Sequence, residues 1–127
     1  ILDDATQGLL READQVVLVM PPALDGARVA ASTLDWLDRN GFHDLVATSV
    51  AVVNGVRSEN TLVHLDAVED HFRARCAGVV RIPWDRALEA GARTALDDLR
   101  PATRDAYLEL AATVAEQFEV PSLRGRR

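Results

Sequence analysis

Residues 13–37 read ADQVVLVMPPALDGARVAASTLDWL, and this stretch decides the fold. It contains an unbroken apolar run, Val16–Met20, which is as long as a typical strand. Continuous runs of this kind are typical of strands covered on both faces, as in a parallel sheet. Pro21 and Pro22 end the run because proline has no N–H to donate to a neighbouring strand.

A helix is predicted directly after the two prolines. Asp25 suits its N-cap because the carboxylate accepts hydrogen bonds from backbone N–H groups two or three residues later. Val29, Thr33 and Leu37 then recur at helical spacing, which predicts the face that packs on the sheet. A strand followed by a helix is the unit that returns the chain for a second, parallel strand.

The same unit recurs further along the chain. A second apolar strand is predicted from Leu45 or Val46 to Val53, followed by an Asn-Gly turn at 54–55. A third strand is predicted over 78–82 and is ended by Pro83. Such alternation of strands and helices gives right-handed crossovers. The sequence therefore predicts a three-layer α/β domain, with a parallel sheet of about three strands and helices on both faces.

Three further helices complete this pattern. One is predicted over 1–13, one is capped by Asn60 or Thr61, and the last has Pro101 in its first turn, where the missing N–H costs nothing. The apolar faces predicted for the last two helices are Leu62, Leu65, Val68 or Glu69, and Phe72, and then Tyr107, Leu110, Ala111, Val114 and Phe118.

The composition argues against some classes of function and favours one cellular location. The formal net charge of -6 argues against nonspecific nucleic-acid binding. No apolar run approaches the length of about 18 residues that spans a bilayer. Cys76 is the only cysteine, which favours a buried thiol in a reducing compartment and hence a cytoplasmic location. The chain starts at Ile1, within an apolar-periodic stretch, so we expect it to belong to a longer protein.

Lysine is absent, since all 14 basic residues are arginine. A Walker-type phosphate loop needs a lysine ammonium against the β- and γ-phosphates, and Schiff-base chemistry needs a lysine amine. The chain itself therefore supplies neither. His64 and His71 lie on one predicted helix, but they are nearly two turns apart, so a solvated polar face explains them better than a metal site.

Four residues near the predicted strand ends are candidates for ligand binding: Asn54, Pro83, Trp84 and Asp85. Ligands of open parallel sheets bind beyond the carboxyl ends of the strands. An asparagine there offers a carbonyl acceptor and an amide donor, the complement of an adenine edge. The alternatives stay open: Asn54 in a turn that needs no ligand, and Trp84 as a core aromatic.

Three segments resemble the second half of the MinD/ParA group of deviant-Walker P-loop ATPases. They are 13–37, quoted above, TSVAVVNGV at 48–56 and GVVRIPWDRALEAG at 78–91. The alanine-rich, arginine-only sequence also resembles MinD-like ATPases of actinobacterial type VII (ESX) secretion loci. Two positions depart from the group's pattern: Gly55, where arginine often follows the asparagine, and Trp84, where tyrosine or an acidic residue is common.

The resemblance implies a division of labour within a larger ATPase. Residues 1–121 would be a partial P-loop NTPase-like domain without the Walker A half, and 122–127 a disordered tail. Asn54 would bind adenine, Pro83 and Trp84 would pack near the base, and Asp85 would shape the loop. ATP and Mg would serve the intact enzyme, with no tight binding and no hydrolysis by this fragment. Its partners would be a second copy, in a homodimer formed through the ATPase fold, and a secretion-system protein.

A different class of function competes with this interpretation. The missing lysine equally fits a non-catalytic interaction module or scaffold built on a degenerate ATPase fold. A receiver-like signalling domain fits poorly, because its phosphoacceptor Asp should follow a strand, and Pro21, Asn54 and Pro83 occupy those positions instead.

Overall fold

The sheet has three parallel strands in the order β1-β2-β3: β1 (Val17–Met20), β2 (Val50–Val56) and β3 (Gly78–Pro83). The computed structural model describes residues 3–58, 62–89, 91 and 93–118. Val17 of β1 lies opposite Val50 of β2, which lies opposite Gly78 of β3, so all three strands start level. Each strand is largely apolar, as the sequence predicts, although β2 includes Asn54 and β3 includes Arg81.

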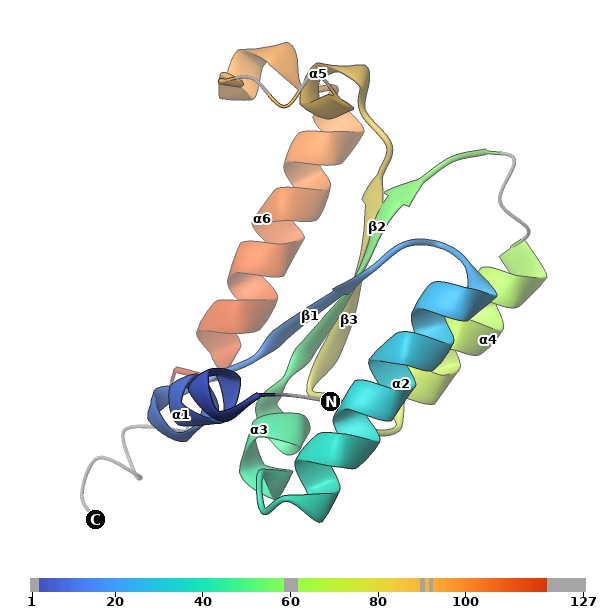
Figure 1. Cartoon of the computed structure of the whole chain (residues 1–127). Coiled ribbons are helices and arrows are strands. Elements are labelled where there is room, and N and C mark those ends of the chain that lie inside the picture. Colours follow the sequence, from blue (N-terminus) through green and yellow to red (C-terminus); the bar gives the residue numbers. More distant parts are fainter. Residues whose placement is uncertain (1–2, 59–61, 90, 92, 119–127) are drawn as a thin grey trace.

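Helices cover both faces of this sheet (Figure 1). The crossover helices α2 (Leu24–Arg39) and α4 (Leu62–Arg73) lie on one face, and α6 (Pro101–Glu116) lies on the other. The predicted three-layer α/β class with a three-stranded parallel sheet is confirmed. Within the described residues, no helix is both long and apolar enough to cross a membrane.

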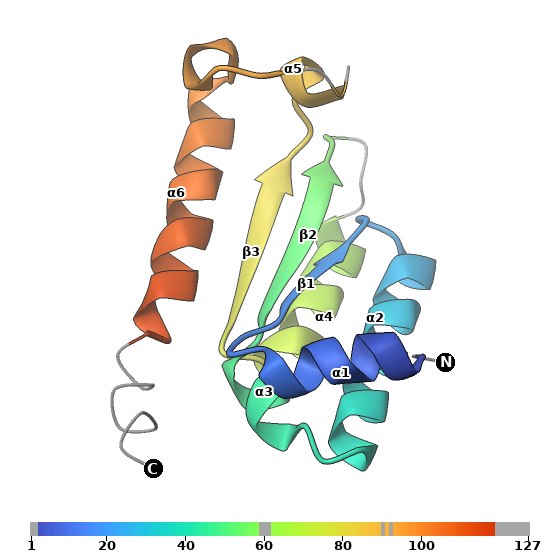
Figure 2. The ribbon, with the colours of Figure 1, turned by 60° about the vertical axis from the view of Figure 1, so that its left-hand side comes forward.

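The remaining elements lie at the two ends of the strands (Figures 1 and 2). The helices α1 (Asp4–Glu12) and α3 (His43–Thr48) lie at the amino ends. At the carboxyl ends, α5 (Arg86–Glu89) and the short 3-10 helix η1 (Leu96–Asp98) connect β3 to α6. The carboxyl ends therefore carry the irregular segments in which ligands of such folds are found.

Two apolar clusters hold the layers together. Between the sheet and the crossover helices, the fully buried members include Met20, Leu34, Leu37, Val53 and Phe72. Between the sheet and α6 the buried members are Val50, Val52, Val80, Ile82 and Ala106. Every second residue of a strand faces the same layer, which is why neighbouring positions of β2 belong to different clusters.

The predicted start of the second strand is wrong. Leu45 and Val46 lie in α3, and β2 begins only at Val50. The Thr48 hydroxyl donates to the Asp44 carbonyl (2.9 Å), and the Ser49 hydroxyl donates to the Val46 carbonyl (2.7 Å). These side chains satisfy carbonyls at the end of a helical turn, so the apolar run divides into a helix and a strand.

The start and the buried face of α2 also differ from the prediction. Its N-cap is Ala23, and Asp25 lies in the first turn, where its charge still complements the helix dipole. Val29 is 68% exposed. The buried positions are Ala27, Ala30, Leu34 and Leu37. The small residues let the first turns of α2 approach the sheet, so the face is set by volume as well as by spacing.

Two predicted helix faces are partly correct. On α4, Leu65, Glu69 and Phe72 are buried. On α6, Leu110 and Val114 pack on the core as predicted, whereas Tyr107 is 38% and Phe118 is 63% exposed. The helix caps predicted at Asn60 or Thr61, the side chain of Leu62 and the tail 122–127 lie outside the described residues. The predicted domain extent, 1–121, stays a prediction.

Candidate functional site

The carboxyl ends of β2 and β3 form a rim that contains all four candidate residues. Asn54 lies opposite Ile82, and Val56 lies opposite Pro83. The Trp84 N–H donates to the Val56 carbonyl at 2.8 Å, which continues the pairing past the end of β3. The structure therefore brings Asn54 and the segment 83–85 side by side, and Asn54 itself is exposed.

The Asn-Gly pair makes a bulge instead of the predicted turn. The strand continues to Val56, and the pairing register shifts between Asn54 and Val56. Gly55 has a φ of 81°, a left-handed conformation that residues with a Cβ seldom adopt. A bulge of this kind, with glycine at its first position, bends the strand and re-aims the neighbouring side chains.

The guanidinium group of Arg57 packs over the ring of Trp84. The guanidinium carbon of Arg57 lies 4.3 Å from the ring centroid, well within the range of a cation–π contact. Trp84 is half-buried and Arg57 is exposed, so this pair forms part of the rim's accessible surface. The pairing was not predicted, although an arginine three residues after Asn54 is visible in the sequence.

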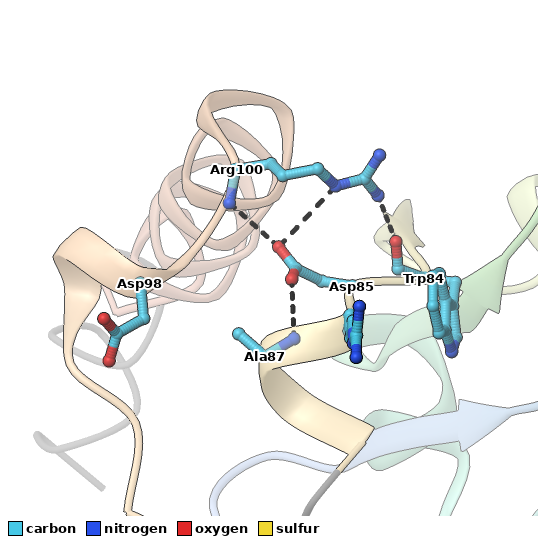
Figure 3. A pocket seen from close by; sticks show the side chains of 6 residues that line it. Trp84, Asp85, Ala87, Asp98 and Arg100 are labelled. Carbon is cyan, nitrogen blue, oxygen red and sulfur yellow. Dashed lines mark hydrogen bonds and ion pairs between the residues drawn. The ribbon is translucent and has the colours of Figure 1, made fainter.

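Asp85 is buried and connects three segments of the rim (Figure 3). Its carboxylate accepts hydrogen bonds from the Arg100 N–H and the Ala87 N–H, each at 2.9 Å. These two backbone donors, Arg100 first, lower the pKa of the Asp85 carboxyl. The Arg100 guanidinium also lies 3.8 Å from this carboxylate and donates to the Trp84 carbonyl. Asp85 thus fixes the loop and is already engaged by protein groups.

A cavity of about 570 Å³ opens beside this carboxylate (Figure 3). Its volume is within the range of small-molecule sites. Its lining residues are Trp84, Asp85, Arg86, Ala87, Asp98 and Arg100. Two of the four candidate residues line it, whereas Asn54 and Pro83 do not. The two aspartates balance the two arginines, so the lining charges do not select an anion or a cation.

Two further features of the sequence are the helix α4, which carries His64 and His71, and the single cysteine. Among the described residues, no three or more His, Cys, Asp or Glu side chains are grouped so as to hold a metal. Glu69, which is 6% exposed, accepts a hydrogen bond from Arg81 Nε at 2.5 Å and so joins α4 to β3. Cys76 is half-buried, and burial raises the pKa of its thiol, which favours the protonated form at neutral pH.

The chain is similar to a secretion-associated protein of mycobacteria. It is 36% identical over 119 residues to the ESX-1 secretion-associated protein EspI of Mycobacterium tuberculosis, strains CDC 1551 / Oshkosh and ATCC 25618 / H37Rv. The match covers 92% of this chain and 18% of EspI, so the chain spans about one-fifth of the relative's length. No protein-family model and no solved structure matches the chain.

These findings correct the predicted family. Membership of the MinD/ParA ATPases is not supported, because no family model matches and the relatives found carry the name of a secretion-associated protein. The segments that suggested the family are apolar strands ending in Asn or Pro, with small residues in the next helix. Apolar strands joined by helices are common to many parallel α/β folds, so these segments specify the fold more strongly than the activity.

Proposed function

We propose that this chain is a domain of an ESX (type VII) secretion-associated protein and acts there as a protein-binding module. The observation that supports this proposal is the 36% identity to EspI over 92% of the chain. An identity that extends over nearly the whole domain, rather than over one motif, favours a shared role for the domain. The single, half-buried cysteine is compatible with a cytoplasmic location for this module.

A domain exchange tests the secretion role. The region of EspI that matches this chain is deleted in M. tuberculosis or replaced by the 127 residues, and ESX-1 secretion is measured. We expect the deletion to change secretion and the replacement to restore it, whereas an unrelated α/β domain of similar size should not. If the deletion leaves secretion unchanged, or if the replacement behaves like the unrelated domain, the proposal is wrong.

We also propose, as a second function, that the rim contacts the base of an adenine nucleotide in the intact protein, with Mg bound to its phosphates. Two features support it: the exposed Asn54 beside the 83–85 segment, and the half-buried Trp84, an aromatic side chain at the same edge of the sheet. The 127-residue chain should show no tight ATP binding in calorimetry. In the intact protein, Asn54→Ala and Trp84→Ala should each weaken Mg-ATP binding, and unchanged affinity in both variants would exclude this contact.

A further inference from the structure

The outer edge of β1 presents backbone groups to which no strand binds among the described residues (Figure 2). The Val50 N–H donates to the Val16 carbonyl at 3.1 Å, so the even-numbered residues of this segment pair with β2. The N–H and C=O groups of Val17 and Val19 therefore point away from β2. Val17 is 43% and Val19 is 60% exposed, so both residues are accessible to a further strand.

The opposite edge of the sheet, on β3, is covered. The Ala77 N–H donates to the Ser49 carbonyl at 2.8 Å, so the residues of β3 that point away from β2 include Val80 and Ile82. Each of these two residues is only 1% exposed, backbone included, and α6 packs alongside β3. Of the two sheet edges in the part of the chain that the structure describes, β1 is therefore the one open to another strand.

The sheet face beside α6 is also incompletely covered at β1. The side chains of Val17 and Val19 lie on the same face as those of Val50 and Val52, because residues opposite each other on neighbouring strands share a face. Helix α6 buries the pair in β2 and leaves the pair in β1 exposed. Strands are about 4.8 Å apart and a helix is about 10 Å wide, so one helix covers about two strands. The third strand on this face therefore needs a second helix beside α6.

The sequence of β1 is typical of an interior strand. Strands that stay at an edge commonly carry a charged residue or a proline, which discourages pairing. Val17–Met20 contains neither, and all of its residues are apolar. Continuous apolar strands are typical of parallel sheets that are covered on both faces. The composition of β1 and its exposed edge thus both indicate that a further strand and a further helix lie beside it in the native protein.

A second copy of this chain fits the open edge poorly. Pro21 follows β1 directly and has no N–H, so two copies would pair over little more than this one short strand. Such a contact falls below the area of about 1,200 Å² that stable interfaces bury, and the net charge of -6 on each copy opposes association. A strand of the same polypeptide needs no such area, because a short tether gives it an effective concentration in the millimolar range. The observations therefore favour the same polypeptide as the occupant.

The relatives found show that such a polypeptide has ample further chain. The match covers 18% of EspI, so about four-fifths of that protein lies outside it. We propose that a further strand of the same polypeptide, outside these 127 residues, pairs with β1, and that a further helix beside α6 covers Val17 and Val19. Strand β1 is then an interior strand of a larger sheet. The proposal shares with the proposed function the premise that the chain is a domain of a longer protein, and it does not depend on the secretion role.

Hydrogen exchange in the full-length protein that contains this chain tests the proposal. The amides of Val17 and Val19 should be protected, like the paired amides of β2, because the further strand accepts their hydrogen bonds. Their protection should be the same in dilute and in concentrated solution, because the strand is tethered. Exchange at the rate of unpaired amides would show that the edge stays open, and protection that grows with protein concentration would show that a second copy occupies it. Either result refutes the proposal.

A matched pair of variants of the full-length protein separates strand pairing from other causes of slow exchange. Val19→Pro removes an outward-facing N–H without removing a bond to β2, so it should speed the exchange of the Val17 amide while the amides of β2 stay protected. Val19→Thr keeps the N–H and the branched shape, and it should leave the Val17 amide protected. Equal exchange of this amide in the two variants would contradict the pairing. The measurement on the unaltered protein decides the proposal even if Val19→Pro does not fold, and neither result bears on secretion, which the domain exchange measures separately.

Discussion

Replacing Gly78 by alanine measures how tightly α6 is held against the sheet. A Cβ added at Gly78 would lie 2.5 Å from Cγ2 of Thr113 on α6. Carbon atoms in good contact are separated by about 3.5–4.0 Å, so the Thr113 side chain, the helix or the strand has to shift by about 1 Å. Overpacking of this kind costs about 1–3 kcal/mol. Removing a glycine from a strand recovers about 0.5–1 kcal/mol. We therefore expect Gly78→Ala to lower the free energy of unfolding by about 0–2.5 kcal/mol.

A double-mutant cycle in urea isolates this contact. Thr113→Ser removes Cγ2 and keeps the hydroxyl that donates to the Glu109 carbonyl at 2.8 Å. In the Thr113→Ser background, Gly78→Ala should cost nothing, or stabilise the chain slightly, giving a coupling free energy of about 1–3 kcal/mol. If Gly78→Ala has the same effect in both backgrounds, the close approach of α6 to β3 is not what requires glycine here.

Three further predictions follow from buried groups. Phe72→Ala should lower the free energy of unfolding, measured in urea, by about 3–5 kcal/mol because Phe72 is 1% exposed. The control is Phe118→Ala: Phe118 is 63% exposed, so this change should alter the free energy of unfolding by less than about 0.5 kcal/mol. The pKa of Asp85 is lowered in the folded chain, so its carboxylate contributes its full stabilisation above the ordinary pKa of 3.8. The urea midpoint of the unaltered chain should therefore exceed that of Asp85→Asn by most near neutral pH, and the difference should shrink as pH falls through the lowered pKa. A pH-independent difference would contradict this. The Cys76 thiol, whose pKa burial raises, should react with a disulfide reagent more slowly in the folded chain than in urea. Equal rates would show that folding neither shields the thiol nor raises its pKa.

The sheet could be predicted from the sequence because its signals are local. Each strand consists mainly of apolar residues, with Asn54 in β2 and Arg81 in β3 as exceptions, and prolines follow β1 and end β3. The segment 43–48 could not be assigned in this way. An apolar run fits a buried helical turn as well as a strand, and only the hydroxyl bonds of Thr48 and Ser49 show which of the two forms.

The rim was predicted in position but not in its contacts. Parallel strands end at one edge of the sheet, so the proximity of Asn54 and Pro83 follows from topology. The role of Asp85 depends on Arg100, which is 15 residues away and held there by α6. Likewise, Arg57 reaches Trp84 because the bulge at Gly55 redirects the end of β2. Neither partner is specified by a local pattern.

The carboxylate of Asp85 also has a consequence for how the protein can vary. It binds the N–H of Ala87 just after β3 and the N–H of Arg100 just before α6, so the intervening chain leaves and returns at one point. Lengthening a segment closed in this way costs only about 0.6 kcal/mol for each doubling. Homologous proteins are therefore free to differ in length between these two positions, and an epitope tag inserted there should leave the three layers intact.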